Sequence, residues 1–289
     1  MKQNFHLLVI DPQNDFCDLP SSYRPRDPLL GAPHAPALPV PGAHHDMLNV
    51  ADLVQRGAAG LSGISVTLDA HHRLDIAHPS FWTDAEQREV APFTQIAAAD
   101  VRAGRYLPRN RASLPRVLAY LDTLEAAGRY TLMVWPVHCE MGTWGQDIHA
   151  DVQSALTHWE NSGAGVVNKV IKGTNPWTEH YSAILAEVPD EDDETTQLNA
   201  CFIDLLASAD RVYISGEAGS HCVKATTEHL VANLDQAQHS KLVLLTDCMS
   251  AVTGFDAQHQ AFIDNMLARG LQTAKAADVL PELIANARR

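Results

Sequence analysis

The stretch Ile214-Ser-Gly-Glu-Ala-Gly-Ser-His-Cys-Val-Lys-Ala-Thr226 decides the fold of this chain. An apolar strand over residues 212–215 runs into two glycines and then into a helical pattern, so that Cys222 lies at the joint. A thiol at the N-terminus of a helix faces unpaired N–H groups and the helix dipole, which favour the thiolate. The same N–H groups can hold an oxyanion. Cysteines are often buried apolar residues, but this strand–glycine–helix context favours a nucleophile.

The length and composition of the chain exclude several classes of protein. Its 289 residues can bury one large α/β core. A net charge of -14 argues against nucleic acid or an anionic membrane as the main partner. No run of 18 apolar residues occurs, so we expect no membrane span. The five scattered cysteines and an N-terminus without a secretory leader predict reduced thiols in a cytoplasmic protein.

Apolar runs alternate with amphipathic helical patterns along the chain. The predicted strands are 6–11, 64–68, 131–135, 166–171, 212–215, 242–245 and a short one near 273. The predicted helices are 46–59, 113–128, 152–159, 181–188, 198–207, one from Cys222, 256–270 and one from 277. This alternation predicts an α/β fold, a three-layer α/β/α sandwich with a mainly parallel, doubly wound six-stranded sheet. We expect a single domain over 1–289, with long loops at about 18–45, 73–112 and 189–197.

Reactive side chains follow four of the predicted strands. Asp11, Asp69, Lys172 and Cys222 all come after apolar runs, and ligands bind beyond the carboxyl ends of strands in such sheets. An aspartate can accept the thiol proton and later give it to a departing amine. A lysine can hold that aspartate and stabilise the thiolate. Spacing alone leaves open the alternative that Asp11 and Lys172 form an ion pair that only ties two loops together.

A second group of residues has the composition of a metal site. Asp69-Ala-His71 places two ligands on one side of a strand, and His138 follows a later strand. Such an Asp/His/His set suits zinc, iron or manganese. His72 and His78 are neighbours that could support the ligands or bind the ion themselves. The alternative is that these histidines only hydrogen-bond within a polar cleft.

Three aromatic residues lie a few positions from the proposed catalytic groups. Phe16, Trp135 and Tyr181 could stack against a flat heteroaromatic ring. Aromatic residues are more often part of a core, so these three do not decide the function by themselves.

Five motifs in this order resemble those of the nicotinamidase/isochorismatase-like cysteine hydrolase superfamily, in its nicotinamidase-related branch. The resemblance covers about residues 5–275 and is specific because the motifs occur together and in order. They are Val9-Ile-Asp-Pro-Gln-Asn-Asp-Phe16, Asp69-Ala-His71, Trp135-Pro-Val-His-Cys139, Lys172-Gly-Thr174 and Gly216-x-Ala-x-Ser-His-Cys-Val223.

The resemblance implies a hydrolase that cleaves the C–N bond of a small amide through a thioester. It assigns Cys222 as nucleophile, Asp11 as base and Lys172 as electrostatic partner. It also implies a cis peptide at Glu217–Ala218 and an oxyanion hole made by the amides of Ala218 and Cys222. It further implies a divalent metal on Asp69, His71 and His138, and ring stacking on Phe16, Trp135 and Tyr181. It implies no organic cofactor, and it implies a homo-oligomer.

Two departures from the family pattern leave the substrate open. Glu217 stands where the family often has an apolar residue, and Ser220 stands where many nicotinamidases have aspartate. The alternatives are hydrolysis of another small amide, carbamoyl compound or ureide, and a hydrolase in which a metal on Asp69, His71 and His138 activates water. A third alternative is a small-molecule binder without activity.

Overall fold

The computed structural model describes all 289 residues and contains a central sheet of six parallel strands in the order β10-β9-β8-β1-β2-β7. All six residues of the central strand β1 are buried, which explains why this strand reads as a continuous apolar run. The predicted fold class is confirmed. The strands are β1 (Phe5–Ile10), β2 (Gly63–Asp69), β7 (Asn168–Lys172), β8 (Arg211–Gly216), β9 (Leu242–Leu245) and β10 (Gln272–Ala274).

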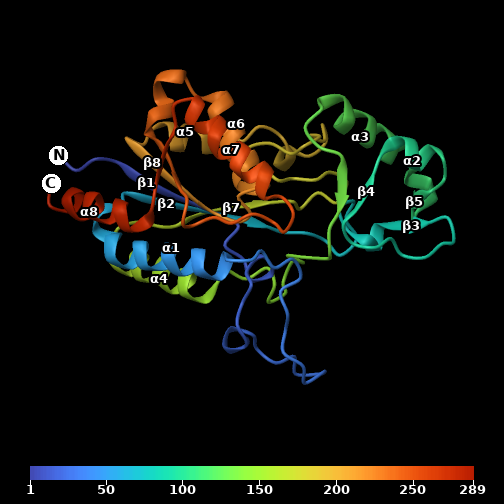
Figure 1. Ribbon diagram of the computed structural model, residues 1–289, viewed down its shortest axis with the longest axis horizontal. Coiled ribbons are helices and arrows are strands. Elements are labelled where there is room, and N and C mark those ends of the chain that lie inside the picture. Colours follow the sequence, from blue (N-terminus) through green and yellow to red (C-terminus); the bar gives the residue numbers. More distant parts are fainter.

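Helices cover both faces of this sheet (Figure 1). One face carries α1 (Ala43–Gly57), α4 (Ala150–Asn161) and α8 (Ala276–Ala287), and the other carries α5 (Ala200–Ala207), α6 (Cys222–Asn233) and α7 (Asp256–Ala268). A cluster of 60 buried apolar residues fills the three layers. From β1 the chain adds β2 and β7 toward one edge of the sheet, and then returns to add β8, β9 and β10 on the other side of β1. The strand order therefore reverses between β1 and β8, where a ligand site is expected.

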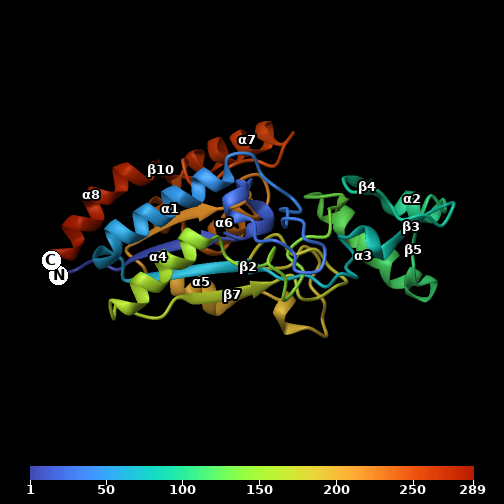
Figure 2. The same ribbon diagram turned by 90° about the horizontal axis from the view of Figure 1, so that it is seen from below.

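A small lobe projects beyond the carboxyl ends of the sheet strands (Figure 2). It has its own cluster of 13 buried apolar residues, with Trp82 fully buried. The prediction that 131–135 belongs to the central sheet is wrong, because β6 pairs antiparallel with β4 in this lobe. The predicted loop over 73–112 instead carries strands of three residues each, too short to show a period. The elements are β3 (Trp82–Asp84), β4 (Thr94–Ile96), α2 (Ala98–Arg102), β5 (Tyr106–Pro108), α3 (Leu114–Ala127) and β6 (Leu132–Val134).

The predicted helix over 181–188 is also wrong. The amides that a helix would use for its internal bonds have other acceptors: Ala186 N donates to the carbonyl oxygen of Thr196 at 3.1 Å and Glu187 N to that of Glu179 at 3.0 Å. These bonds replace the helical ones, although the apolar residues of the segment have helical spacing. The next helix, α5, begins at Ala200, two residues later than predicted.

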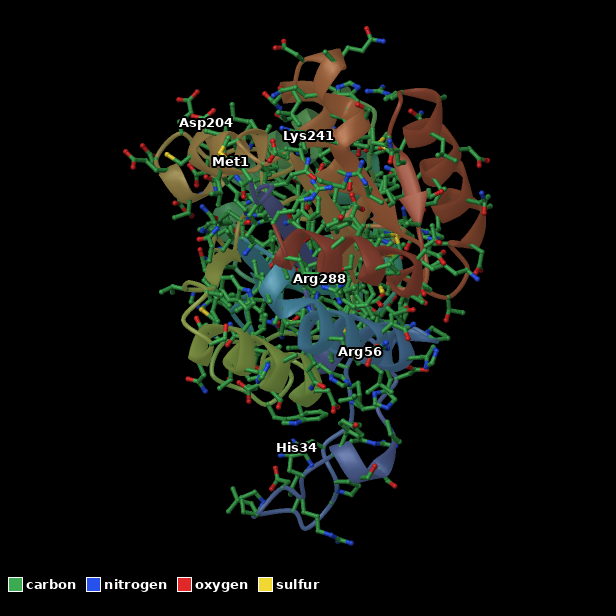
Figure 3. All side chains as sticks on the ribbon, turned by 90° about the vertical axis from the view of Figure 1, so that its left-hand side faces the viewer. Met1, His34, Arg56, Asp204, Lys241 and Arg288 are labelled. Carbon is green, nitrogen blue, oxygen red and sulfur yellow. The ribbon has the colours of Figure 1, made fainter.

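The loop between β1 and α1 extends from the body of the protein as an arm, and His34 lies on it (Figure 3). Its tip exposes Leu29 and Leu30. No helix of the chain combines the length and apolar character that spanning a bilayer requires. All five cysteines are free thiols.

We expect Gly60→Ala to lower the melting temperature strongly. A Cβ at Gly60 would lie 2.1 Å from the carbonyl oxygen of Leu283, a backbone atom that cannot move without shifting α8. Asn286, on the same helix, donates to the Gly60 carbonyl at 2.8 Å, so the strain would spread to that bond. We expect a loss of more than about 2 kcal/mol. The measurement is thermal unfolding by circular dichroism.

Gly128→Ala is the control for that change. Gly128 ends α3 with φ 68°, and no atom lies within 4 Å of an added Cβ, so only the backbone conformation opposes the change. This should cost about 1 kcal/mol. If Gly60→Ala lowered the free energy of unfolding no more than Gly128→Ala does, α8 would accommodate the added Cβ without cost.

Candidate active site

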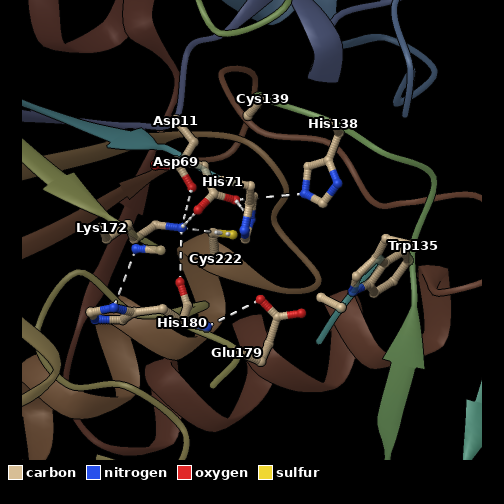
Figure 4. A network of polar contacts seen from close by, with 12 residues as sticks. Asp11, Asp69, His71, Trp135, His138, Cys139, Lys172, Glu179, His180 and Cys222 are labelled. Atoms are coloured by element: carbon tan, nitrogen blue, oxygen red, sulfur yellow. Dashed lines mark hydrogen bonds and ion pairs between the residues drawn. The ribbon is translucent and has the colours of Figure 1, made fainter. Parts of the chain in front are cut away.

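The register of the sheet brings the predicted catalytic residues together. Asp69 and Lys172 are paired across β2 and β7, and Ile10 is paired with Gly216 across β1 and β8. Asp11 follows Ile10 directly, and Cys222 begins α6 just after β8. Because β8, β1, β2 and β7 are consecutive in the sheet, the four reactive side chains meet at one edge (Figure 4).

Lys172 is the centre of this group. Its Nζ lies 2.9 Å from Asp11 Oδ2 and 3.1 Å from Asp69 Oδ1. The same nitrogen donates to Cys222 Sγ at 3.7 Å and to the carbonyl oxygen of His180 at 3.0 Å. Burial works against the charge, but the two carboxylates hold the pKa of Lys172 well above its usual value. Lys172 is therefore a buried cation that contacts both the carboxylates and the thiol.

Asp11 has the surroundings of a carboxylate that can take up a proton. Its side chain is fully buried, and Thr67 Oγ1 donates to its Oδ1 at 2.5 Å. Burial raises the pKa of Asp11, and the Lys172 cation offsets only part of that increase. A raised pKa makes a carboxylate a better base toward a thiol.

The surroundings of Cys222 oppose the thiolate that the helix N-terminus favours. Burial raises the pKa of the thiol well above its usual value, although the Lys172 cation lowers it. The Asp11 carboxylate also raises the pKa of the thiol by its negative charge. Asp11 is placed to take up the proton of this thiol as the sulfur attacks.

Three backbone amides in this turn form no hydrogen bond within the protein, and two of them, those of Ala218 and Cys222, are the predicted oxyanion donors. The third is the amide of Ser220, whereas the amides of Glu217, Gly219, His221 and Val223 all have carbonyl acceptors. The Glu217–Ala218 peptide is cis, as the resemblance implies. Gly216 precedes it with φ 118°, and a Cβ there would lie 1.9 Å from the carbonyl oxygen of Ile10. Only glycine fits this turn.

The predicted metal ligands also converge. Asp69 Oδ2 lies 3.2 Å from His71 Nε2 and 3.7 Å from His138 Nε2. Ring nitrogens of His71, His78 and His138 lie within 4.8 Å of one another, so His78 joins the set. The side chain of His72 is exposed, and its carbonyl oxygen only accepts from His78 Nδ1 at 3.1 Å.

These residues fit a divalent ion. The buried Nε2 of His71 has no hydrogen-bond partner, while Nδ1 of the same ring lies 3.1 Å from Asp75 Oδ2. A carboxylate on the far nitrogen is the usual support of a metal-binding histidine. Three imidazoles and one carboxylate suit zinc, iron or manganese. Sequence reasoning missed Asp75, because it lies in an irregular loop without a period.

A pocket of about 340 Å³, its open mouth included, extends from Cys222 and Asp69. Phe16, Trp135 and Tyr181 all line it, and Trp135 Nε1 donates to the Tyr181 hydroxyl at 3.0 Å. The other lining residues are Leu38, His138, Glu179, Ala218, His221 and Val252.

Glu179 is a site residue that the sequence analysis did not find. Its side chain is buried, its Oε2 atom has no partner, and burial raises its pKa to about 7. The only signal in the sequence is that Glu179 lies two residues before Tyr181, and none of the five motifs includes it. A protonatable group of this kind in the wall can pair with a polar atom of a ligand.

No protein-family model and no curated protein matches the chain. Solved structures do match over nearly their full lengths. A nicotinamidase/pyrazinamidase from Acinetobacter baumanii has a TM-score of 0.60 at 19% identity, covering 96% of this chain and 98% of that one. A pyrazinamidase from Pyrococcus horikoshii in complex with zinc has a TM-score of 0.54 at 19% identity, with 94% and 99% covered.

An isochorismatase-like hydrolase from Alkaliphilus metalliredigens matches with a TM-score of 0.51 at 15% identity, covering 96% of this chain and 98% of that chain. The chain therefore has the fold of the nicotinamidase/isochorismatase-like hydrolase superfamily. Within that fold, its structural neighbours include nicotinamidases and pyrazinamidases.

Proposed function

We propose that the protein is a cysteine-dependent amidohydrolase that cleaves the C–N bond of a small amide. The observation that carries the proposal is the contact of Lys172 with both Asp11 and Cys222, beside the unpartnered amides of Ala218 and Cys222. Asp11 removes the Cys222 proton as sulfur attacks the amide carbonyl. The amides of Ala218 and Cys222 stabilise the oxyanion.

The same groups complete the reaction. Asp11 returns the proton to the departing amine, leaving an acyl thioester on Cys222. Asp11 then takes a proton from water, which attacks the thioester and releases the carboxylic acid. Lys172 stays charged throughout and stabilises the ionised forms of Asp11 and Cys222.

The pocket favours a small, flat amide such as nicotinamide. Its aromatic walls, Phe16, Trp135 and Tyr181, suit a planar ring. The test is ammonia release from a panel of small amides, carbamoyl compounds and ureides, nicotinamide included, with and without iodoacetamide pretreatment. Thiol-sensitive release from one of them supports the proposal. Release that survives alkylation but not chelation would instead favour metal-activated water.

We propose that Asp69, His71, His78 and His138 hold a divalent metal ion at the edge of this pocket. A bound ion would supply a Lewis-acidic position for a ring nitrogen or a water molecule. The chain's own groups still provide the nucleophile and the base. A homo-oligomer and a cytoplasmic location stay predictions.

His71→Ala should abolish stoichiometric metal binding. His71 contacts Asp69 and has an otherwise unsatisfied buried nitrogen, so its loss removes a ligand from the centre of the set. Metal content is measured by mass spectrometry after reconstitution with zinc, iron or manganese. His72→Ala is the matched control, because that side chain is exposed and its carbonyl is retained. Equal metal content in both variants would contradict the site.

A further inference from the structure

Glu217 is a buried acid with no role in the mechanism above. Its side chain is 0% exposed and leads away from the pocket toward α1 and the segment after β9. Oε2 accepts from the amide of Ser250 at 3.2 Å, whereas Oε1 meets no donor. The neighbouring acid is Asp46 on α1, and Ser250 links the two side chains through its amide and its hydroxyl.

Ser250 Oγ donates to Asp46 Oδ2 at 2.5 Å, which favours the ionised form of Asp46. Burial, then the charges of Asp46 and Asp18, raise the pKa of Glu217 well above its usual value, which favours the protonated form of Glu217. The other titratable groups facing it are the thiols of Cys17 and Cys248.

Ser250 connects this acid pair to the oxyanion hole. Its amide binds the Glu217 side chain, and its carbonyl oxygen accepts from Gly219 N at 2.7 Å. Glu217 N in turn donates to the carbonyl oxygen of Ile10 at 2.8 Å. The residues on both sides of Ala218 are thus fixed, while the amide of Ala218 itself is left free.

We propose that Glu217 is a positioning residue that, through its side-chain bond to Ser250, holds the Ala218 amide in place for the oxyanion. This inference rests on the proposed amidohydrolase function and deepens it. It gives a role to the residue by which this chain departs from the apolar pattern of the family. The acid acts only through the backbone, because its side chain does not line the pocket.

The first test compares Glu217→Leu with Glu217→Gln. Glutamine keeps an oxygen that can accept from Ser250 N, whereas leucine has a similar size and cannot accept a hydrogen bond. We expect Glu217→Leu to lower kcat by about ten- to a hundredfold with little change in KM. Glu217→Gln should stay within about threefold of the wild type. Leucine with wild-type kcat, or glutamine as impaired as leucine, would overturn the inference.

The second test uses pH. Below the usual pKa of 4.5, Glu217 is protonated whether the chain is folded or unfolded. Above it, only the folded state retains the proton, so stability relative to Glu217→Gln falls as pH rises. The melting temperature of Glu217→Gln should therefore exceed that of the wild type by a margin that grows from about pH 5 to about pH 9. A margin independent of pH would show that Glu217 is not protonated.

Two controls separate this inference from the proposed function. Iodoacetamide labels a thiol without forming an oxyanion, so Cys222 should be alkylated in Glu217→Leu at a rate within about twofold of the wild type. Glu187→Gln also removes an unpartnered, mostly buried carboxyl group and should leave kcat unchanged. If the wild type hydrolyses no amide, the proposed function fails, and the pH dependence of unfolding still decides the state of Glu217.

Discussion

Cys222→Ala is expected to reduce amide turnover by at least about 10⁴-fold while leaving the protein folded. Without the thiol no thioester can form, and the oxyanion amides alone provide only weak catalysis. Lys172 keeps its contacts with Asp11, Asp69 and the carbonyl of His180, so no buried charge loses its partners. The expected effect is therefore on the reaction and not on the fold.

The measurement is single-turnover hydrolysis of the best amide from the panel, together with far-UV circular dichroism. Cys201→Ala is the matched control, because that thiol is exposed on α5 and lies outside the pocket. It should retain full activity. Residual turnover of more than a few per cent in Cys222→Ala would remove the cysteine from the mechanism and leave metal-activated water as the alternative.

The sequence predicts the sheet and the gathering of the site for one physical reason. Strands covered on both faces are continuously apolar, so the first polar residue after each run marks its carboxyl end. Asp11, which follows the fully buried strand β1, is the clearest case, whereas β7 before Lys172 is an edge strand with exposed residues. The register of β1, β2 and β7 places Asp11, Asp69 and Lys172 side by side. The strand-to-helix turn before Cys222 completes the set.

The lobe and the irregular segments could not be predicted in the same way. Strands such as β3 and β6 have three residues, and their period cannot be distinguished from chance. The segment 181–188 has helical spacing, but the carbonyl oxygen of Thr196, outside the segment, accepts from the amide of Ala186. A bond of that kind depends on the fold and leaves no local signal.

Proton positions are the other property that sequence reasoning did not provide. A helix N-terminus at Cys222 suggests a thiolate, yet the thiol is buried, and burial raises its pKa. Burial depends on how completely α6 and the loops cover the site, which no local pattern reports. Glu179 and Glu217 were left without a role for the same reason. Both are acids whose properties follow from burial.

Asp11→Asn is expected to slow amide hydrolysis by about 10²- to 10⁴-fold. Asparagine has nearly the same shape and can still bond Thr67 and Lys172, but it cannot take or return a proton. Lys172 keeps Asp69 at 3.1 Å, so the buried cation retains a carboxylate and the fold should persist. Asp69→Asn is the matched control, because it also removes one carboxylate from Lys172 but should reduce metal content and leave the base intact.

Alkylation of Cys222 in Asp11→Asn tells which step the base serves. The Asp11 carboxylate raises the pKa of the thiol by its negative charge, so its removal should increase the thiolate fraction. Iodoacetamide should therefore label Cys222 in this variant at least as fast as in the wild type, although amide turnover falls. That divergence would mean that Asp11 is needed to protonate the departing amine and to activate water. If labelling and turnover fell together, Asp11 would act only by ionising the thiol, and the leaving group would need another acid.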